Sequence, residues 1–280
     1  MAVPHYAVFG SPVAHSLSPR IHAAFARQCG IALIYVPLDT AEVGFAATFE
    51  RFAAAGGIGA NVTAPDKAAA ASVCARLSSR AQRAGVVNTL ALTPTGWQGD
   101  TTDGIGLVRD LRERRDLGLY QARVLLVGAG GAARSVAPAL LDADIAQLVV
   151  ANRTRATAYD LIDALDAADR VRACTPDEVA SQGAFDLVIH AATPADDGAQ
   201  PDLPGSILAD GATVVDLNYG ARALPMLAWA ARNGCARAFD GLGMLVEQAA
   251  ESFELWHGMR PDTDPVYAQL RLSGRTATGV

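Results

Sequence analysis

The most constraining feature of the chain is an apolar strand that runs directly into a glycine-rich turn and a helix. Residues 123–127 read RVLLV, and residues 128–133 read GAGGAA. On both sides of this unit, short apolar runs alternate with longer segments in which apolar residues recur at helical spacing. Strands separated by helices form a parallel or mixed sheet with helices on its faces. The sequence therefore predicts an α/β protein.

The glycine turn matches the pattern G-x-G-x-x-A in the context that gives this pattern meaning, between a strand and a helix. Gly128 allows a tight turn, and Gly130 lets the backbone approach a pyrophosphate at the N-terminus of the following helix. The alternative is an ordinary strand-turn-helix built from small residues. We interpret the turn as a dinucleotide site, with candidate contacts at Gly128, Ala129, Gly130, Gly131 and Ala132.

The end of the next predicted strand indicates which dinucleotide binds. An acidic residue there would favour the ribose of NAD. This chain instead has Asn152, Arg153, Thr154 and Arg155, without a carboxylate. A guanidinium pairs well with a ribose 2′-phosphate, so we predict NADP rather than NAD. Alternatively, the two arginines are solvated residues at a helix start.

Lys67 is the only lysine of the chain, whose other 22 basic residues are arginine. An arginine stays protonated, whereas a lysine can act as acid and base. A compositional bias against lysine is the alternative explanation. The position favours a functional role, because Lys67 ends the segment GANVTAPDK, where an apolar strand runs into polar residues and a helix start.

Further polar side chains occur at predicted strand ends. In an extended loop, Ser16 and Ser18 point to the same side, although Ser18 could instead cap a helix beginning at Pro19. If the strands are parallel neighbours, their polar ends converge on one crevice. Hydroxyls, amides, one lysine and one carboxylate suit a small polyhydroxylated acid, and no metal-ligand spacing occurs. The set comprises Ser16, Ser18, Asn61, Thr63, Lys67, Asn88 and Asp103.

Composition excludes several classes of protein. The net charge of −6 and the pI near 5.3 argue against a nucleic-acid surface. Four separated cysteines are typical of reduced core residues rather than metal ligands. No signal peptide is visible and no run of about 18 apolar residues occurs. We therefore expect a soluble, cytoplasmic protein that does not bind a membrane.

The chain is expected to cross between two domains twice, with a cleft between them. The first domain contains predicted strands at 5–9, 32–38, 57–62 and 86–92 and predicted helices at 18–29, 44–55 and 66–83. A helical segment, 103–116, leads into the second domain. The long amphipathic segment 242–256 is expected to pack back on the first domain. The predicted boundaries are 1–103 with 241–280, and 104–240.

Taken together, these segments resemble the shikimate dehydrogenase family over nearly the whole chain. The matching segments are VFGSPVAHSLSPRIHAAFA, GANVTAPDK, GVVNTLA, GDTTDGIG, GAGGAARS, NRT, DLNYG and DGLGMLVEQAAESFELWHG. The resemblance implies an N-terminal substrate domain with a mixed, mainly parallel sheet and a Rossmann-type NADP-binding domain. It implies NADPH-dependent reduction of 3-dehydroshikimate to shikimate in aromatic amino acid biosynthesis, by a monomer or homodimer.

The resemblance also implies roles for individual residues. Ser16 and Ser18 match contacts to the substrate carboxylate, and Lys67 with Asp103 matches the catalytic pair. Hydride delivery to a ketone builds negative charge on its oxygen, so a nearby acid such as the Lys67 ammonium is needed. Implied ring-hydroxyl contacts are Asn61, Thr63, Asn88, Asp103 and Gln248. Implied contacts of the cofactor are Arg153 and Thr154 at the 2′-phosphate, Gly241 beside the nicotinamide, and Thr193 and Leu217. Tyr219, also on the nicotinamide side, is an implied contact of the substrate.

Four positions depart from the family pattern: Thr101, Asp66, His190 and Thr157. We expect Asp66 in solvent and His190 at a strand end rather than in catalysis. Thr157 stands where a second basic residue is common, and Arg155 could replace it. Two alternatives stay open: a quinate/shikimate dehydrogenase of broader specificity, and a non-catalytic NADP-binding regulatory module.

Overall fold

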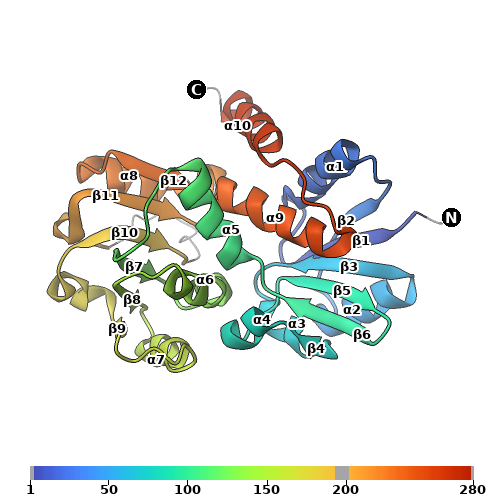
Figure 1. The fold of residues 1–280 in the computed structure, drawn as a ribbon, viewed down its shortest axis with the longest axis horizontal. Coiled ribbons are helices and arrows are strands. Elements are labelled where there is room, and N and C mark those ends of the chain that lie inside the picture. Colours follow the sequence, from blue (N-terminus) through green and yellow to red (C-terminus); the bar gives the residue numbers. More distant parts are fainter. Residues whose placement is uncertain (1–2, 193–201, 279–280) are drawn as a thin grey trace. The chain divides into compact units, whose positions relative to one another are not determined.

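The computed structural model of the chain describes residues 3–192 and 202–278. The chain folds into two compact units (Figure 1). The first unit consists of Met1–Gly106 with Val246–Val280, and the second is Leu107–Leu245. Each unit carries one six-stranded sheet, so the α/β class predicted from the alternating pattern is confirmed. Among the described residues, no helix is long and apolar enough to cross a membrane.

The sheet of the first unit is mixed, in the order β2-β1-β3-β5-β6-β4. The pairs β1–β2, β1–β3 and β4–β6 are parallel, whereas β5 runs antiparallel to both β3 and β6. The strands are β1 (His5–Gly10), β2 (Ile34–Asp39), β3 (Gly57–Val62), β4 (Arg76–Leu77), β5 (Thr89–Thr93) and β6 (Gly96–Asp100).

Helices bury both faces of this sheet. On one face, Phe9 of β1 packs against the rings of Phe45, Phe49 and Phe52. On the other face, Tyr6, three residues before Phe9, packs against Trp256, because residues an odd number of positions apart in a strand point to opposite faces. The helices of this unit are α1 (Ser18–Cys29), α2 (Gly44–Ala54), α3 (Lys67–Ala71), α4 (Ser79–Ala84), α10 (Asp264–Thr278), and from Val246 onward α9 (Leu242–His257).

The segment 66–83 differs from the single helix predicted from its periodicity. It forms α3, the short strand β4 and α4. The backbone N–H of Ala75 donates to Trp97 O and that of Ser78 donates to Gly99 O, so the middle of the segment pairs with β6. The Ser78 hydroxyl then caps α4 by accepting from the Ala81 N–H. Sheet pairing overrides the alanine-rich helical pattern here.

The second unit is a doubly wound sheet in which all strand pairs are parallel. The strand order is β12-β11-β10-β7-β8-β9, so the first strand of the unit, β7, lies in the middle and the order reverses between β7 and β10. Ligands bind at such a reversal in open α/β sheets. The strands are β7 (Arg123–Val127), β8 (Gln147–Ala151), β9 (Val171–Cys174), β10 (Phe185–His190), β11 (Leu208–Asp216) and β12 (Arg237–Asp240).

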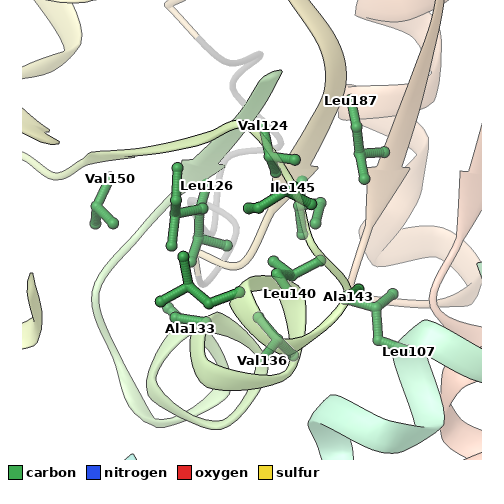
Figure 2. Close-up of a cluster of buried hydrophobic side chains, with 14 of the residues drawn as sticks. Leu107, Val124, Leu126, Ala133, Val136, Leu140, Ala143, Ile145, Val150 and Leu187 are labelled. Carbon is green, nitrogen blue, oxygen red and sulfur yellow. The ribbon is translucent and has the colours of Figure 1, made fainter. Parts of the chain in front are cut away.

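The core of this unit has two layers because β7 is buried on both faces. Val124 and Leu126 belong to one buried cluster with Ala133, Val136 and Leu140 of α6, drawn in Figure 2. Leu125 belongs to the opposite cluster, which includes Trp229 of α8. The helical elements are α5 (Asp103–Arg109), which begins in the first unit, η1 (Asp110–Arg114), α6 (Gly131–Asp142), α7 (Arg155–Asp163), η2 (Pro176–Gln182), η3 (Gly205–Ile207), η4 (Gly220–Ala223) and α8 (Leu224–Arg232).

Candidate active site

Polar side chains of the first unit meet at one edge of its sheet. Asn61 of β3 is aligned with Thr89 of β5, which in turn is aligned with Asp100 of β6. Because β5 is antiparallel to both neighbours, its start lies beside the ends of β3 and β6. The condition named from the sequence, that these strands are parallel neighbours, is therefore not met by β5, although the polar residues do converge. Lys67 begins α3 after β3, and Asp103 begins α5 after β6.

Lys67 and Asp103 form an ion pair. The Lys67 Nζ lies 2.5 Å from Asp103 Oδ2, and the two side chains are only 12% and 7% exposed. An ammonium and a carboxylate held away from water interact strongly and keep a fixed geometry. The structure thus brings together the two residues predicted to act as a catalytic pair.

Asn88 connects this pair to α9. Its side-chain amide nitrogen donates to Asp103 Oδ1 at 2.8 Å and to Gln248 Oε1 at 3.2 Å. Its amide oxygen accepts from the Thr102 backbone N–H at 2.8 Å. Asn88 is 2% exposed, and both polar atoms of its amide have protein partners. It fixes which oxygen of Asp103 faces Lys67.

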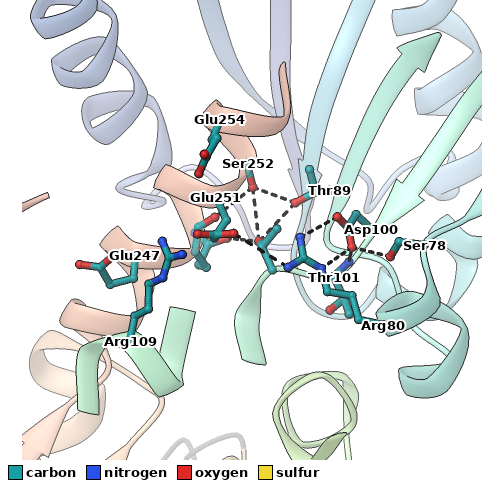
Figure 3. Close-up of polar contacts among 12 residues, drawn as sticks. Ser78, Arg80, Thr89, Asp100, Thr101, Arg109, Glu247, Glu251, Ser252 and Glu254 are labelled. Carbon is teal, nitrogen blue, oxygen red and sulfur yellow. Dashed lines mark hydrogen bonds and ion pairs between the residues drawn. The ribbon is translucent and has the colours of Figure 1, made fainter. Parts of the chain in front are cut away.

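Asp100, three residues before Asp103, anchors the turn between them, and Figure 3 shows its side chain beside Ser78, Arg80 and Thr101. The Asp100 carboxylate accepts two hydrogen bonds from Arg80, both at 2.7 Å, and one from the Ser78 hydroxyl at 2.5 Å. It also accepts from the Thr101 N–H at 2.7 Å. Arg80 in addition lies 3.9 Å from Glu251 of α9. Bidentate arginine–carboxylate geometry is strong and directional, and it rigidifies the turn.

Asn61 lies in a buried network rather than on an open surface. It is 5% exposed, and its amide oxygen accepts from the Tyr35 hydroxyl at 2.8 Å. Burial raises the pKa of Tyr35, so this phenol stays a donor. The Asn61 amide nitrogen donates to Ser252 Oγ at 2.9 Å and to Thr89 Oγ1 at 3.2 Å. These contacts give Asn61 a role in holding β3, β5 and α9 together.

The two predicted carboxylate-binding serines lie at the start of α1. The Ser18 backbone N–H donates to Ser16 Oγ at 3.2 Å. The helix begins at Ser18 with Leu17 in the capping position, and no side chain caps it. The alternative interpretation of Ser18 as a helix cap is therefore wrong. Thr63, which follows β3, is half-buried, and its hydroxyl has no hydrogen-bonding partner among the described residues.

In the second unit, the glycine turn follows β7 at the reversal of strand order. Gly128 has φ of 106°, and a Cβ there would lie 3.0 Å from Ala191 C and Ala192 N. Both its conformation and its close approach to the end of β10 require glycine. A Cβ on Gly130 would meet nothing within 4 Å. The space beside Gly130 and the N–H groups at the start of α6, which have no partner within the helix, fit a dinucleotide pyrophosphate.

The basic segment after β8 is open to solvent. Arg153, Thr154 and Arg155 are exposed, and the Asn152 amide nitrogen donates to Thr154 O at 2.9 Å, which fixes the turn. Arg155 begins α7 and pairs with Glu178 Oε1 at 2.5 Å. Arg153 forms no ion pair among the described residues. Arg153 is thus the guanidinium available to an anion at this strand end.

The remaining predicted cofactor contacts follow β11 and β12. The Leu217 N–H donates to His190 O and the Gly241 N–H donates to Asn218 O, both at 2.8 Å. A Cβ on Gly241 would lie 2.6 Å from the Leu217 carbonyl carbon, so this position also requires glycine. Tyr219 is half-buried before η4. Thr193 lies outside the described residues.

Comparisons with known proteins agree with this geometry. The chain matches the shikimate dehydrogenase substrate binding domain over residues 8–90, the shikimate/quinate 5-dehydrogenase family over residues 110–196, and the shikimate 5′-dehydrogenase C-terminal domain over residues 241–271. It is 54% identical over 275 residues to the shikimate dehydrogenase (NADP(+)) of Stenotrophomonas maltophilia (strain K279a), covering 98% of each chain. The chain belongs to the shikimate dehydrogenase family. The resemblance predicted from the sequence is confirmed.

Other members of the shikimate dehydrogenase family show the same likeness. The shikimate dehydrogenase (NADP(+)) of Xanthomonas campestris pv. campestris (strain 8004) is 56% identical over 274 residues, covering 97% of this chain and 96% of the relative. The crystal structure of shikimate 5-dehydrogenase from Thermus thermophilus in complex with NADP(H) and shikimate superposes with a TM-score of 0.84 at 31% identity, covering 96% of this chain and 99% of that one.

Three departures from the shikimate dehydrogenase pattern now have a structural context. His190 is the last residue of β10, and its Nδ1 lies 3.2 Å from Asp216 Oδ2, which places it at a strand end as expected. Asp66 is half-buried and accepts from the Thr40 hydroxyl at 2.6 Å, so the expectation that it points into solvent is wrong. Thr101 is buried, and its backbone N–H donates to Asp100 Oδ1, which stabilises the turn.

Sequence reasoning missed several residues that support the polar cluster, among them Tyr35, Ser78, Arg80 and Asp100. Their contacts join segments that are far apart in the chain, which no periodicity reveals. Of these four, Asp100 carried a signal, because it lies in the segment GDTTDGIG that matches the family.

Proposed function

We propose that the chain catalyses the reversible, NADPH-dependent reduction of 3-dehydroshikimate to shikimate, a step in aromatic amino acid biosynthesis. Members of its family that are more than half identical carry the name shikimate dehydrogenase (NADP(+)). The observation that carries the proposal is the Lys67–Asp103 pair in a buried network of amides and hydroxyls. A binding module would not need a transferable proton there.

In the proposed mechanism, Lys67 is the general acid. Reduction of a ketone leaves negative charge on its oxygen, and the Lys67 Nζ supplies the proton that neutralises it. Asp103 holds the ammonium through Oδ2, while Asn88 holds Oδ1. In the reverse direction, Lys67 takes the proton from the substrate hydroxyl. We place Ser16 and Ser18 at the substrate carboxylate, and Asn61, Thr63, Asn88, Asp103, Gln248 and Tyr219 at the rest of the substrate.

We assign the cofactor site to the second unit. NADPH supplies the hydride when bound. The start of α6 would hold the pyrophosphate, since Gly130 leaves space there and the backbone N–H groups are free. Arg153, with Asn152 and Thr154, would hold the 2′-phosphate, beside Arg155, which pairs with Glu178. Leu217 and Gly241 would line the nicotinamide side. The domain assignment that accompanies this proposal is substrate binding by the first unit and dinucleotide binding by the second.

The test is a set of absorbance assays on one preparation of the purified protein. NADPH oxidation is followed with 3-dehydroshikimate, and reduction of NADP⁺ and NAD⁺ is followed with shikimate and with quinate. We expect turnover of shikimate with NADP⁺ and little turnover of quinate. Comparable rates with quinate would indicate the broader dehydrogenase, whereas NADP⁺ binding without turnover of either acid would indicate a regulatory module.

We further infer that the protein works in the cytoplasm on a small-molecule substrate, as a monomer or a homodimer. All four cysteines are free thiols, which is in keeping with a reducing compartment. Fractionation of the source cells and sedimentation velocity would test the location and the assembly.

A further inference from the structure

The strand order of the second unit defines two sides of the proposed 2′-phosphate site. The glycine turn follows β7, the basic segment follows β8, and Glu178 lies on η2, which follows β9. These strands are neighbours in the order β7-β8-β9. A dinucleotide whose pyrophosphate lies after β7 reaches its ribose phosphate over the end of β8. Glu178 therefore lies on the side of β8 that is away from the pyrophosphate.

Glu178 holds Arg155 on that far side. The Arg155 Nη2 lies 2.5 Å from Glu178 Oε1. The second carboxylate oxygen, Oε2, accepts from the Thr175 backbone N–H at 3.0 Å, which completes a capping box at the start of η2. The Thr175 backbone and Arg155 together lower the pKa of Glu178, so its negative charge persists. Arg155 is consequently fixed to an anchored carboxylate.

Arg153 and Arg155 differ in their freedom. Both are exposed, but Arg153 has no ion-pair partner among the described residues. Thr157, two residues further on, carries no charge. The site accordingly contains one uncommitted guanidinium, one guanidinium paired with Glu178, and one carboxylate whose field repels a phosphate.

We propose that Glu178 is a specificity-determining residue that restricts the affinity for the 2′-phosphate of NADP by keeping Arg155 engaged. This inference rests on the proposed location of the 2′-phosphate after β8. The pair is exposed, with side-chain exposures of 49% and 35%, and exposed ion pairs rearrange at low cost. Removal of the Glu178 charge releases Arg155 toward the phosphate and removes a repulsion, and both effects favour NADPH over NADH.

The test is Glu178→Gln, because glutamine retains the capping box at this position and changes only the charge. We expect the KM for NADPH to fall about threefold or more at low ionic strength, with the KM for NADH nearly unchanged and the gain reduced by added salt. The matched control is Asp177→Asn, an exposed neighbour that carries the same charge. An unchanged or higher KM for NADPH in Glu178→Gln, or an equal fall in Asp177→Asn, would overturn the proposal.

Two further variants separate this inference from the site on which it rests. The gain from Glu178→Gln should shrink when Arg155→Ala is also present, because the gain acts through that guanidinium, and an equal gain in both backgrounds would refute it. Arg153→Ala should raise the KM for NADPH and leave that for NADH unchanged. If Arg153→Ala has no effect, the 2′-phosphate binds elsewhere and the inference fails together with that part of the proposed function. If only Glu178→Gln has none, the site stands and the inference alone is wrong.

Discussion

The sharpest test of the proposed chemistry is Lys67→Arg. Lys67 and Asp103 are both nearly buried and lie 2.5 Å apart. Arginine keeps a cation beside Asp103 and so avoids an unpaired buried carboxylate, but it does not give up its proton at accessible pH. The substitution therefore removes proton transfer while it preserves the charge balance of the site.

The expected loss is the full contribution of a general acid, about 10²–10⁴-fold in kcat. At about 1.4 kcal/mol for each factor of ten, this corresponds to about 3–5 kcal/mol of transition-state stabilisation. The KM for 3-dehydroshikimate should change much less, because the other proposed substrate contacts, among them Ser16 and Ser18, are unchanged. Initial rates of NADPH oxidation at saturating cofactor measure both parameters.

A second variant separates proton transfer from folding. In Lys67→Met, the Asp103 carboxylate loses its cation. Among the described residues, only the hydrogen bond from Asn88 Nδ2 and the dipole at the start of α5 then stabilise its negative charge. The substitution should lower the free energy of unfolding by about 1–3 kcal/mol in urea titrations. The double variant with Asp103→Asn should regain that stability and stay inactive. A Lys67→Arg protein that keeps kcat within a factor of about ten would refute the acid–base role.

Three other parts of the structure give further predictions. Arg80→Met should lower the free energy of unfolding in urea by about 1–3 kcal/mol, less than for a fully buried pair. The loss is limited because Asp100 keeps two other donors and Arg80 is about a third exposed. The kcat should also fall, and an unchanged kcat would show that the turn does not position Asp103. Gly130→Ala should fold normally, because its Cβ meets no atom of the described residues within 4 Å, yet it should lose the rise in Tm that NADP⁺ gives. Gly128→Ala should instead be destabilised without any ligand. Equal NADP⁺ shifts in Gly130→Ala and the parent would contradict the pyrophosphate site. Burial lowers the pKa of His22 from 6.5 to about 3, so between these pH values the unfolded chain binds more protons than the folded one. The free energy of unfolding therefore falls as pH drops from about 6.5. His22→Phe should weaken this pH dependence in urea titrations, and an unaltered dependence would exclude His22 as its source.

Local chemistry carried most of what the sequence predicted. The glycine turn was recognisable because φ at Gly128 and the space at Gly130 restrict which residues can stand there. Lys67 and Asp103 were recognisable as polar residues at strand ends. The split of 66–83 into α3, β4 and α4 was not, because pairing with β6 decides it and the partner lies in another segment. The ion pair of Arg155 with Glu178 joins residues 23 positions apart in the sequence, so no local pattern predicts it.

The solitary lysine has a consequence for how the protein can be studied. A lysine-specific endoproteinase has one peptide bond to cleave in the whole chain, the one that follows Lys67 at the first residue of α3. That bond lies in a helix whose first side chain is held by Asp103, so cleavage requires α3 to open locally. When opening and closing are fast relative to cleavage, the rate reports the free energy of that opening. The chain thus contains its own single-site probe of motion in the segment that carries the proposed acid.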